Sequence, residues 1–183
     1  MKKLIIIIAA ILVIAGGLVS SYNDLVSMHE QVNSSWAQVD TQLQRRADLI
    51  PNLVNTVKGY ASHEQEAVKA VADARSKLLN ASTPTDKISA NGELSNALGR
   101  LLMVAENYPD LKASQNFLAL QDELAGTENR ISVARRDYNN QVQKYNAKIH
   151  SFPVSLYAGA FGFTDAPYFK ADEGAKAAPK VQF

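Results

Sequence analysis

The chain has 183 residues, enough for one domain with an apolar core of its own. Its 19 lysine and arginine residues almost balance its 18 aspartate and glutamate residues, which argues against a nucleic-acid partner because phosphate binding requires a basic surface. The absence of cysteine excludes disulfides, thiol nucleophiles, cysteine-based zinc sites and a lipidated cysteine anchor.

The N-terminus consists of a short flank, residues 1–3, and an apolar segment that we place at residues 4–21. Its length lies between that of a secretory signal core and that of a complete membrane span, so both interpretations fit, and the length favours an anchor. The apolar side chains that we assign to the membrane anchor are Leu4, Ile5, Ile6, Ile7, Ile8, Ile11, Leu12, Val13, Ile14, Leu18 and Val19.

The distribution of positive charge predicts the orientation of this span. Lys2 and Lys3 precede it, and no lysine or arginine follows it before Arg45. The positive-inside rule therefore predicts that the N-terminus lies in the cytoplasm and that the body of the protein lies outside it.

A long helical pattern follows the anchor. From Tyr22 to Leu78, core positions recur at alternating spacings of three and four, which is typical of a helix with one apolar seam. The phase does not slip at Pro51, so we predict one helix over residues 22–80 that is kinked at this proline. A break into two helices at Pro51 is the alternative, because helices often end just before a proline.

Two further segments complete the predicted bundle. The sequence NASTPTDK at residues 80–87 predicts a turn and a helix start, and ENYPDLKA at residues 106–113 interrupts the helix that follows. A third long helix has an apolar seam that reaches Phe152. We therefore predict an all-α fold: a transmembrane helix, then an elongated antiparallel up-and-down bundle over residues 22–152, with three long helices, or four if the first breaks at Pro51.

The composition changes at Pro153, where an aromatic, glycine-containing stretch leads into a polar, alanine-rich end. We treat residues 153–183 as a C-terminal aromatic segment and tail, and we expect about the last ten residues to be loosely held. The larger apolar side chains of this segment are expected to pack on the membrane-proximal end of the bundle: Leu156, Tyr157, Phe161, Phe163 and Phe169.

Both long seams carry polar residues at positions where apolar residues are expected. An antiparallel pairing in which partner residue numbers sum to 174 places Trp36 opposite Tyr138 and Arg46 opposite Glu128. Buried charges add little net stability but penalise wrong registers, so we interpret the set as a structural network. The predicted buried polar network comprises Arg46, Glu128, Arg135, Gln121 and Glu64.

We find no motif that would make this network catalytic. The His63-Glu64 pair lacks the second histidine that a zincin helix requires, and the chain carries no serine-triad motif, phosphate loop or dinucleotide fingerprint. We therefore predict that the protein is not an enzyme and has no catalytic residues, metal site or cofactor.

Several stretches of the chain resemble the LemA family. The longest runs from Trp36 to Glu64 as W-x-Q-V-D-x-Q-L-Q-R-R-x-D-L-I-P-N-L-V-x-x-V-K-G-Y-A-x-H-E, and the others are ENYPDLKA and ELAGTENRISVARRDYNNQVQKYN at residues 123–146. The resemblance covers nearly the whole chain. It implies a bacterial single-span membrane protein with an uncleaved anchor, an α-helical bundle and no established molecular activity. The family is often described with its short N-terminus outside the cell, opposite to the orientation that the charges predict.

We predict a membrane-anchored helical adaptor or scaffold without catalytic activity, single-pass in the bacterial inner (cytoplasmic) membrane. Its expected partners are the membrane, proteins that the sequence does not identify, and further copies of itself, but no nucleic acid. The residues expected to form the partner surface are Asn52, Lys58, Asn107, Tyr108 and Asp110.

Two alternatives stay open. A ligand-binding or catalytic protein would need a pocket of about 300 Å³ or more beside the buried charges. The residues of that site would be Arg46, Asp48, Glu128 and Arg135. A structural oligomer in the membrane plane would instead need an exposed apolar stripe, for which the sequence offers only Ala61, Val68 and Ala72.

Overall fold

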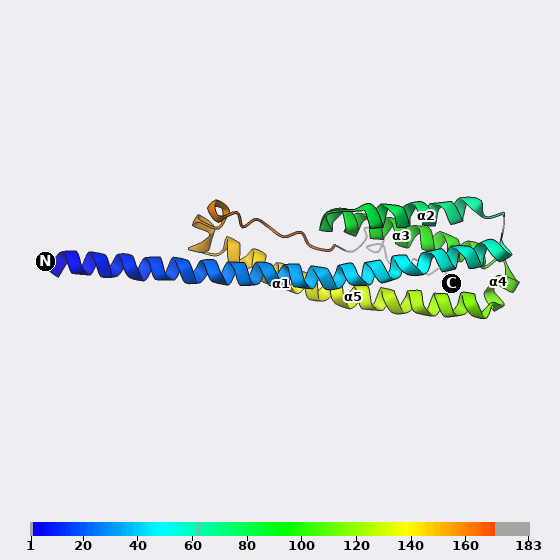
Figure 1. Cartoon of the computed structure of the whole chain (residues 1–183), viewed down its shortest axis with the longest axis horizontal. Helices are drawn as coiled ribbons and strands as arrows, with labels where there is room; N and C mark the ends of the chain where they lie inside the picture. The colour runs from blue at the N-terminus through cyan, green and yellow to red at the C-terminus, as the bar shows by residue number, and fades with distance from the viewer. Residues whose placement is uncertain (1, 62, 171–183) are drawn as a thin grey trace, which may run out of the picture. The chain divides into compact units, whose positions relative to one another are not determined.

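The computed structural model describes residues 2–61 and 63–170, and every regular element in these ranges is a helix. The elements are α1 (Lys2–Tyr60), α2 (Gln65–Asn80), α3 (Pro84–Ala105), α4 (Pro109–Ala113), α5 (Gln115–His150) and two 3₁₀ turns, η1 (Val154–Leu156) and η2 (Gly159–Phe161) (Figure 1). The predicted all-α class is confirmed. The tail that we expected to be loosely held lies outside the described residues.

These elements form two compact units. Of the described residues, the first unit combines those up to Trp36 with Asp137–Ala166, and the second combines those of Ala37–Arg136 with residues 167–170. Helices α1 and α5 each contribute residues to both units.

The N-terminal part of α1 is apolar and bare. Every described side chain from Lys2 to Ser20 is exposed, and this stretch is long and apolar enough to cross a membrane. Apolar side chains that pack against no other part of the protein are what lipid-facing positions require.

The prediction of one helix over residues 22–80 is wrong, and so is the alternative break at Pro51. α1 continues through Pro51 and ends at Tyr60, and α2 begins at Gln65. The apolar spacing runs on across the turn because α2 needs the same spacing of three and four for its own buried face. That face comprises Val68, Val71, Ala74 and Leu78.

The helix tolerates Pro51 because a side chain replaces the missing backbone donor. Proline has no N–H, so the carbonyl of Ala47, four residues earlier, loses its partner within the helix. Arg75 of α2 donates its Nε–H to this carbonyl oxygen over 2.8 Å. Ala47 is buried, so the carbonyl would otherwise lack a partner.

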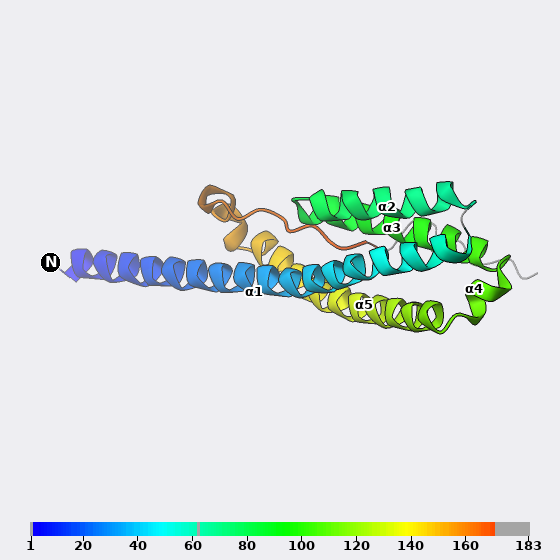
Figure 2. The ribbon, with the colours of Figure 1, turned by 45° about the vertical axis from the view of Figure 1, so that its right-hand side comes forward.

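In the second unit, α2 and α3 form a helical hairpin (Figures 1 and 2). The predicted helix start is confirmed, because the Thr83 side chain accepts a hydrogen bond from the backbone N–H of Asp86 and Pro84 occupies the first turn. The largest fully buried side chains of this unit are Leu43, Ile50, Leu53, Leu94, Leu101, Leu111, Phe117 and Ile131.

In the first unit, α1 packs against α5 through aromatic side chains. The rings of Trp36 and Tyr138 meet edge to face with centroids 5.3 Å apart, as the predicted register requires. His29 meets Tyr145 in the same way at 5.5 Å. Tyr138 and Tyr145 are both buried, so these contacts form the core of the unit.

The burial of Tyr138 makes the stability of the first unit sensitive to high pH. Burial raises the pKa of the Tyr138 phenol from 10.0 to about 12. Between these values the phenol of the unfolded chain loses its proton while that of the folded chain keeps it. The protein therefore keeps its full free energy of unfolding below pH 10 and loses part of it as the pH rises above 10. The expected loss by pH 12 is on the order of 2 kcal/mol.

The fluorescence of Trp36, the single tryptophan, reports unfolding of this unit directly. The measurement compares denaturant unfolding of the full chain and of Tyr138→Phe between pH 9 and pH 12. Over this pH range the free energy of unfolding of Tyr138→Phe should fall by about 2 kcal/mol less than that of the wild type. Equal losses in the two proteins would show that Tyr138 is not the group responsible.

In the C-terminal segment, two of the five side chains predicted to pack on the membrane-proximal end of the bundle do not do so. Tyr157, Phe161 and Phe163 do contact α1 in the first unit. Leu156 is exposed instead of packed. Phe169 is buried in the second unit, where its ring centroid lies 5.6 Å from the Arg135 guanidinium carbon.

Candidate functional site

Arg46 is a charged residue buried in the second unit. Its Nη1 group donates to the Asn91 side-chain oxygen and to the Ser95 hydroxyl, both over 3.0 Å, and it lies 2.8 Å from a carboxylate oxygen of Glu128. Arg46 therefore links α1 to α3 and α5. The contact with Glu128 is the one that the predicted register requires.

The two partners of this ion pair differ strongly in burial, which corrects the prediction of a buried pair. The Arg46 side chain is 8% exposed, whereas the Glu128 side chain is 52% exposed. The buried acceptor is Asn91, which the sequence analysis missed. Asn91 lies three residues before Leu94 and seven before Leu98, on the apolar seam of α3, and this spacing could have identified it.

The other members of the predicted network lie apart from Arg46 and are half-buried. Glu64 accepts a hydrogen bond from the Tyr108 hydroxyl over 2.9 Å. Arg135 lies over the Phe169 ring. Gln121 lines the same groove as Arg46. Glu64 and Arg135 thus have partners other than the Arg46–Glu128 pair, and the role of the network in register selection stays a prediction.

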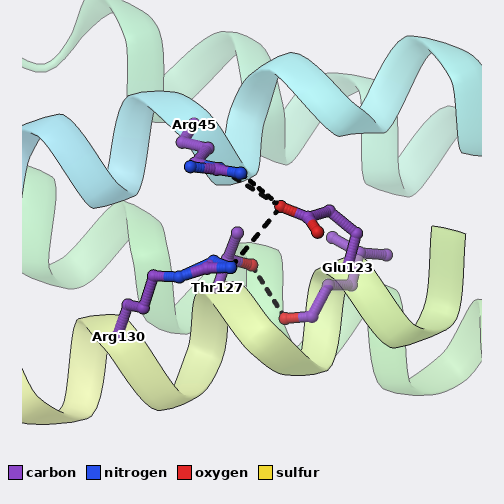
Figure 3. Close-up of polar contacts among 5 residues, drawn as sticks. Arg45, Glu123, Thr127 and Arg130 are labelled. Carbon is purple, nitrogen blue, oxygen red and sulfur yellow. Dashed lines mark hydrogen bonds and ion pairs between the residues drawn. The ribbon is translucent and has the colours of Figure 1, made fainter.

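Arg45, the neighbour of Arg46, lies on the surface. Figure 3 shows Arg45 donating from Nε and Nη2 to one carboxylate oxygen of Glu123, over 3.2 and 2.7 Å. Arg130 approaches the same oxygen at 3.7 Å, and Thr127 donates its hydroxyl to the Leu124 carbonyl over 2.7 Å. The Arg45-Arg46 pair thus binds two carboxylates of α5, one through an exposed arginine and one through a buried arginine.

A groove of about 450 Å³ opens beside Arg46, between α3 and α5, and we name it the α3–α5 groove. Its volume exceeds what the ligand-binding alternative requires. Arg46 and Glu128 line it, whereas Asp48 and Arg135, the other residues of that alternative, do not. Its remaining lining residues are Ser95, Leu98, Gly99, Leu102, Gln121, Asp122, Leu124 and Ala125.

A second groove, of about 610 Å³, lies between the end of α1 and the start of α2, and we name it the α1–α2 groove. It has an apolar floor and two lysines among its lining residues. These residues are Val54, Lys58, Ala61, Glu64, Gln65, Val68, Lys69 and Ala72. Because Ala61 and Val68 are buried in this floor, the exposed apolar stripe expected for an oligomer is not formed by the three residues named for it.

The structure brings only part of the predicted partner surface together. Lys58 is exposed and lines the α1–α2 groove, whereas Asn52, Asn107 and Asp110 are exposed outside its lining. Tyr108 was expected to be exposed and is half-buried. Its hydroxyl donates to Glu64, which raises the pKa of the Tyr108 phenol. Tyr108 therefore positions a lining residue of the groove.

Metal-ligating side chains are not clustered in the part of the chain that the structure describes. In residues 2–61 and 63–170 no group of three or more histidine, cysteine, aspartate or glutamate side chains could hold a metal ion.

The fold and the apolar span define the class of this protein: a membrane-associated, single-pass helical protein with its folded part formed by an all-α bundle. The comparison with protein families identifies the family within this class. The model of the LemA family matches residues 35–183, and the chain belongs to this family.

Individual relatives are distant but cover most of the chain. Magnetosome protein MamQ 2 of Paramagnetospirillum magneticum is 26% identical over 91% of this chain and 71% of its own length. Protein LemA of Metamycoplasma hominis is 26% identical over 82% of this chain and 69% of its own length. Magnetosome protein MamQ of Magnetospirillum gryphiswaldense is 25% identical over 83% of this chain and 65% of its own length.

Proposed function

We propose that this protein is a non-catalytic helical adaptor of the bacterial inner membrane, which binds partner proteins or copies of itself through the α1–α2 groove. The observation that carries this proposal is the combination of an apolar floor with Lys58 and Lys69 in one groove. Such a surface fits an amphipathic helix that presents apolar side chains flanked by carboxylates, because both the buried area and the charges are then complementary.

We propose the orientation that the charges predict, with Lys2 and Lys3 in the cytoplasm and the bundle outside it. The chain contains no cysteine, so single cysteines can report this directly. A cysteine at the exposed Ser132 should react in intact cells with a maleimide that does not cross membranes. If this position is labelled only after the cells are opened, the bundle lies in the cytoplasm and the proposed orientation is wrong.

Reversal of the two groove charges tests the proposed binding surface. In the full chain with Lys58→Glu and Lys69→Glu, the amount of membrane protein that co-purifies should be about tenfold lower than with the wild type. A tenfold change corresponds to about 1.4 kcal/mol of binding free energy. The measurement is quantitative mass spectrometry after detergent extraction and affinity purification.

A matched control separates the groove from net charge. Lys112→Glu with Lys144→Glu makes the same change in charge at two exposed positions outside the groove. This variant should retain the partners. Loss of the same proteins in both variants, or in neither, would contradict the proposed surface.

A second candidate function, the binding of a small ligand, is favoured by the volume of the α3–α5 groove. Its leucines suit an apolar ligand body, and the exposed Asp122 carboxylate suits a cationic group. A Cβ added at Gly99 meets no atom within 4 Å, so we expect Gly99→Leu to narrow the groove. The measurement is native mass spectrometry of the protein extracted from membranes. A small-molecule adduct on the wild type that is missing from Gly99→Leu would support this function, and the absence of any adduct on the wild type would contradict it.

A further inference from the structure

The C-terminal segment of the first unit is held against the end of the membrane span. The Tyr157 hydroxyl donates to the Ser21 hydroxyl oxygen over 2.6 Å. The ring of Tyr22 meets those of Phe161 and Phe163 edge to face, with centroids 5.4 and 5.6 Å apart. All these residues belong to one compact unit, so the segment has a defined position next to residues 21 and 22.

This segment combines buried and exposed apolar side chains. Val154 and Ala158 are buried. In contrast, Phe152 is 82% exposed, Leu156 is 75% exposed and Phe161 is 53% exposed. Three large apolar side chains exposed within ten residues form a surface that is unfavourable in water and that marks a site of interaction.

The position of this surface identifies what covers it. Ser21 and Tyr22 lie two and three residues after Val19, the last apolar residue assigned to the span. A helix rises by only about 1.5 Å per residue, so both residues lie close to the end of the apolar run. The interfacial layer on each side of the hydrocarbon core is roughly 5–8 Å thick. Side chains that contact Ser21 and Tyr22 therefore lie at the depth of the lipid headgroups, where aromatic rings are favoured.

We propose that Phe152, Leu156 and Phe161 form a second membrane contact, inserted beside the span at the boundary between lipid headgroups and acyl chains. Phe161 contacts Tyr22, which is itself partly exposed and lies just after the apolar span. The protein then contacts the bilayer at two points instead of one, which restricts rotation and tilt of α1 in the membrane. This proposal rests on the membrane anchor and not on the proposed adaptor function.

The natural absence of cysteine permits a direct measurement of depth. Leu156→Cys and Phe152→Cys in the full chain replace exposed side chains and leave the buried Val154 and Ala158 unchanged. Each variant is labelled with a nitroxide and reconstituted into phospholipid vesicles. Electron paramagnetic resonance then compares collisions of the label with oxygen, which concentrates in the bilayer, and with a water-soluble nickel chelate.

The matched control is Asn140→Cys, an exposed position of α5 in the same unit, on the helix that leads to Phe152. The ratio of oxygen to nickel collisions should be several-fold higher at positions 152 and 156 than at position 140. A ratio equal to that of the control would place the segment in water and overturn the proposal. An immobilised label that neither reagent reaches would show that protein, and not lipid, covers the segment, which would also overturn it.

Discussion

Replacement of Arg46 by methionine should lower the free energy of unfolding of the second unit by about 3 kcal/mol. Methionine fills much of the same volume, so the loss comes mainly from polar groups. The buried side-chain oxygen of Asn91 and the hydroxyl of Ser95 would each lose a donor at 3.0 Å. Leaving one buried polar group without a partner costs about 1–3 kcal/mol. The measurement is denaturant unfolding of the full chain in detergent, followed by circular dichroism.

Two variants separate this effect from the ion pair itself. Glu128→Gln should cost less than about 1 kcal/mol, because its exposed carboxylate regains water when the pair is broken. Adding Asn91→Leu to Arg46→Met should recover part of the loss, since the buried acceptor is then removed as well. If Glu128→Gln is as destabilising as Arg46→Met, the stability depends on the ion pair between Arg46 and Glu128 and not on the hydrogen bond to Asn91.

Arg75→Met should cost about 2–3 kcal/mol in the natural chain and much less when residue 51 is alanine. In the natural chain the Arg75 Nε–H is the donor to the buried Ala47 carbonyl, and charged hydrogen bonds of this kind contribute about 1.5–3 kcal/mol. Pro51→Ala supplies the missing backbone N–H at the correct position in α1, so the carbonyl no longer depends on Arg75. The two substitutions should therefore be coupled by about 2 kcal/mol in a double-mutant cycle.

A control shows whether the hydrogen bond or the charge matters. Lys77→Met removes a different cation of the same helix, one whose ion pair with Glu93 is exposed, and it should cost much less than Arg75→Met does in the natural chain, in either background. Additive effects of Arg75→Met and Pro51→Ala would contradict the assignment of Arg75 as the replacement donor.

The register of the long helices could be predicted from the sequence because it depends on pattern alone. Side chains at spacings of three and four define one face of a helix, and matching the polar positions of two such faces fixes their alignment. The contacts of Trp36 with Tyr138 and of Arg46 with Glu128 both follow from that alignment.

Other features could not be predicted because they depend on a third element. The end of α1 at Tyr60 leaves no trace in the apolar spacing, since α2 continues the same period after the turn. Arg75 contacts Ala47 only because α2 folds back along α1. The buried acceptor beside Arg46 is Asn91 of α3, whereas the Glu128 side chain is 52% exposed, and the pairing of α1 with α5 alone does not predict this difference.

The candidate site was predictable only in part for the same reason. Lys58 could be chosen from α1 as an exposed cation, but Lys69 and Ala72 join it only after the chain reverses between Tyr60 and Gln65. Tyr108 was selected as a contact residue, whereas its hydroxyl is used to position Glu64. A surface assembled from two helices is not visible in the periodicity of either one.

Photocrosslinking in living cells tests the adaptor proposal most directly. A photoreactive amino acid at Lys58 should form a discrete adduct with one protein or with a second copy of this chain, and Ala72→Trp, which fills the α1–α2 groove, should abolish it. The same amino acid at the exposed Lys144, outside the groove, is the control and should give no such adduct. Identical patterns from positions 58 and 144, or an adduct that persists after the groove is filled, would contradict the proposal that this groove binds a partner.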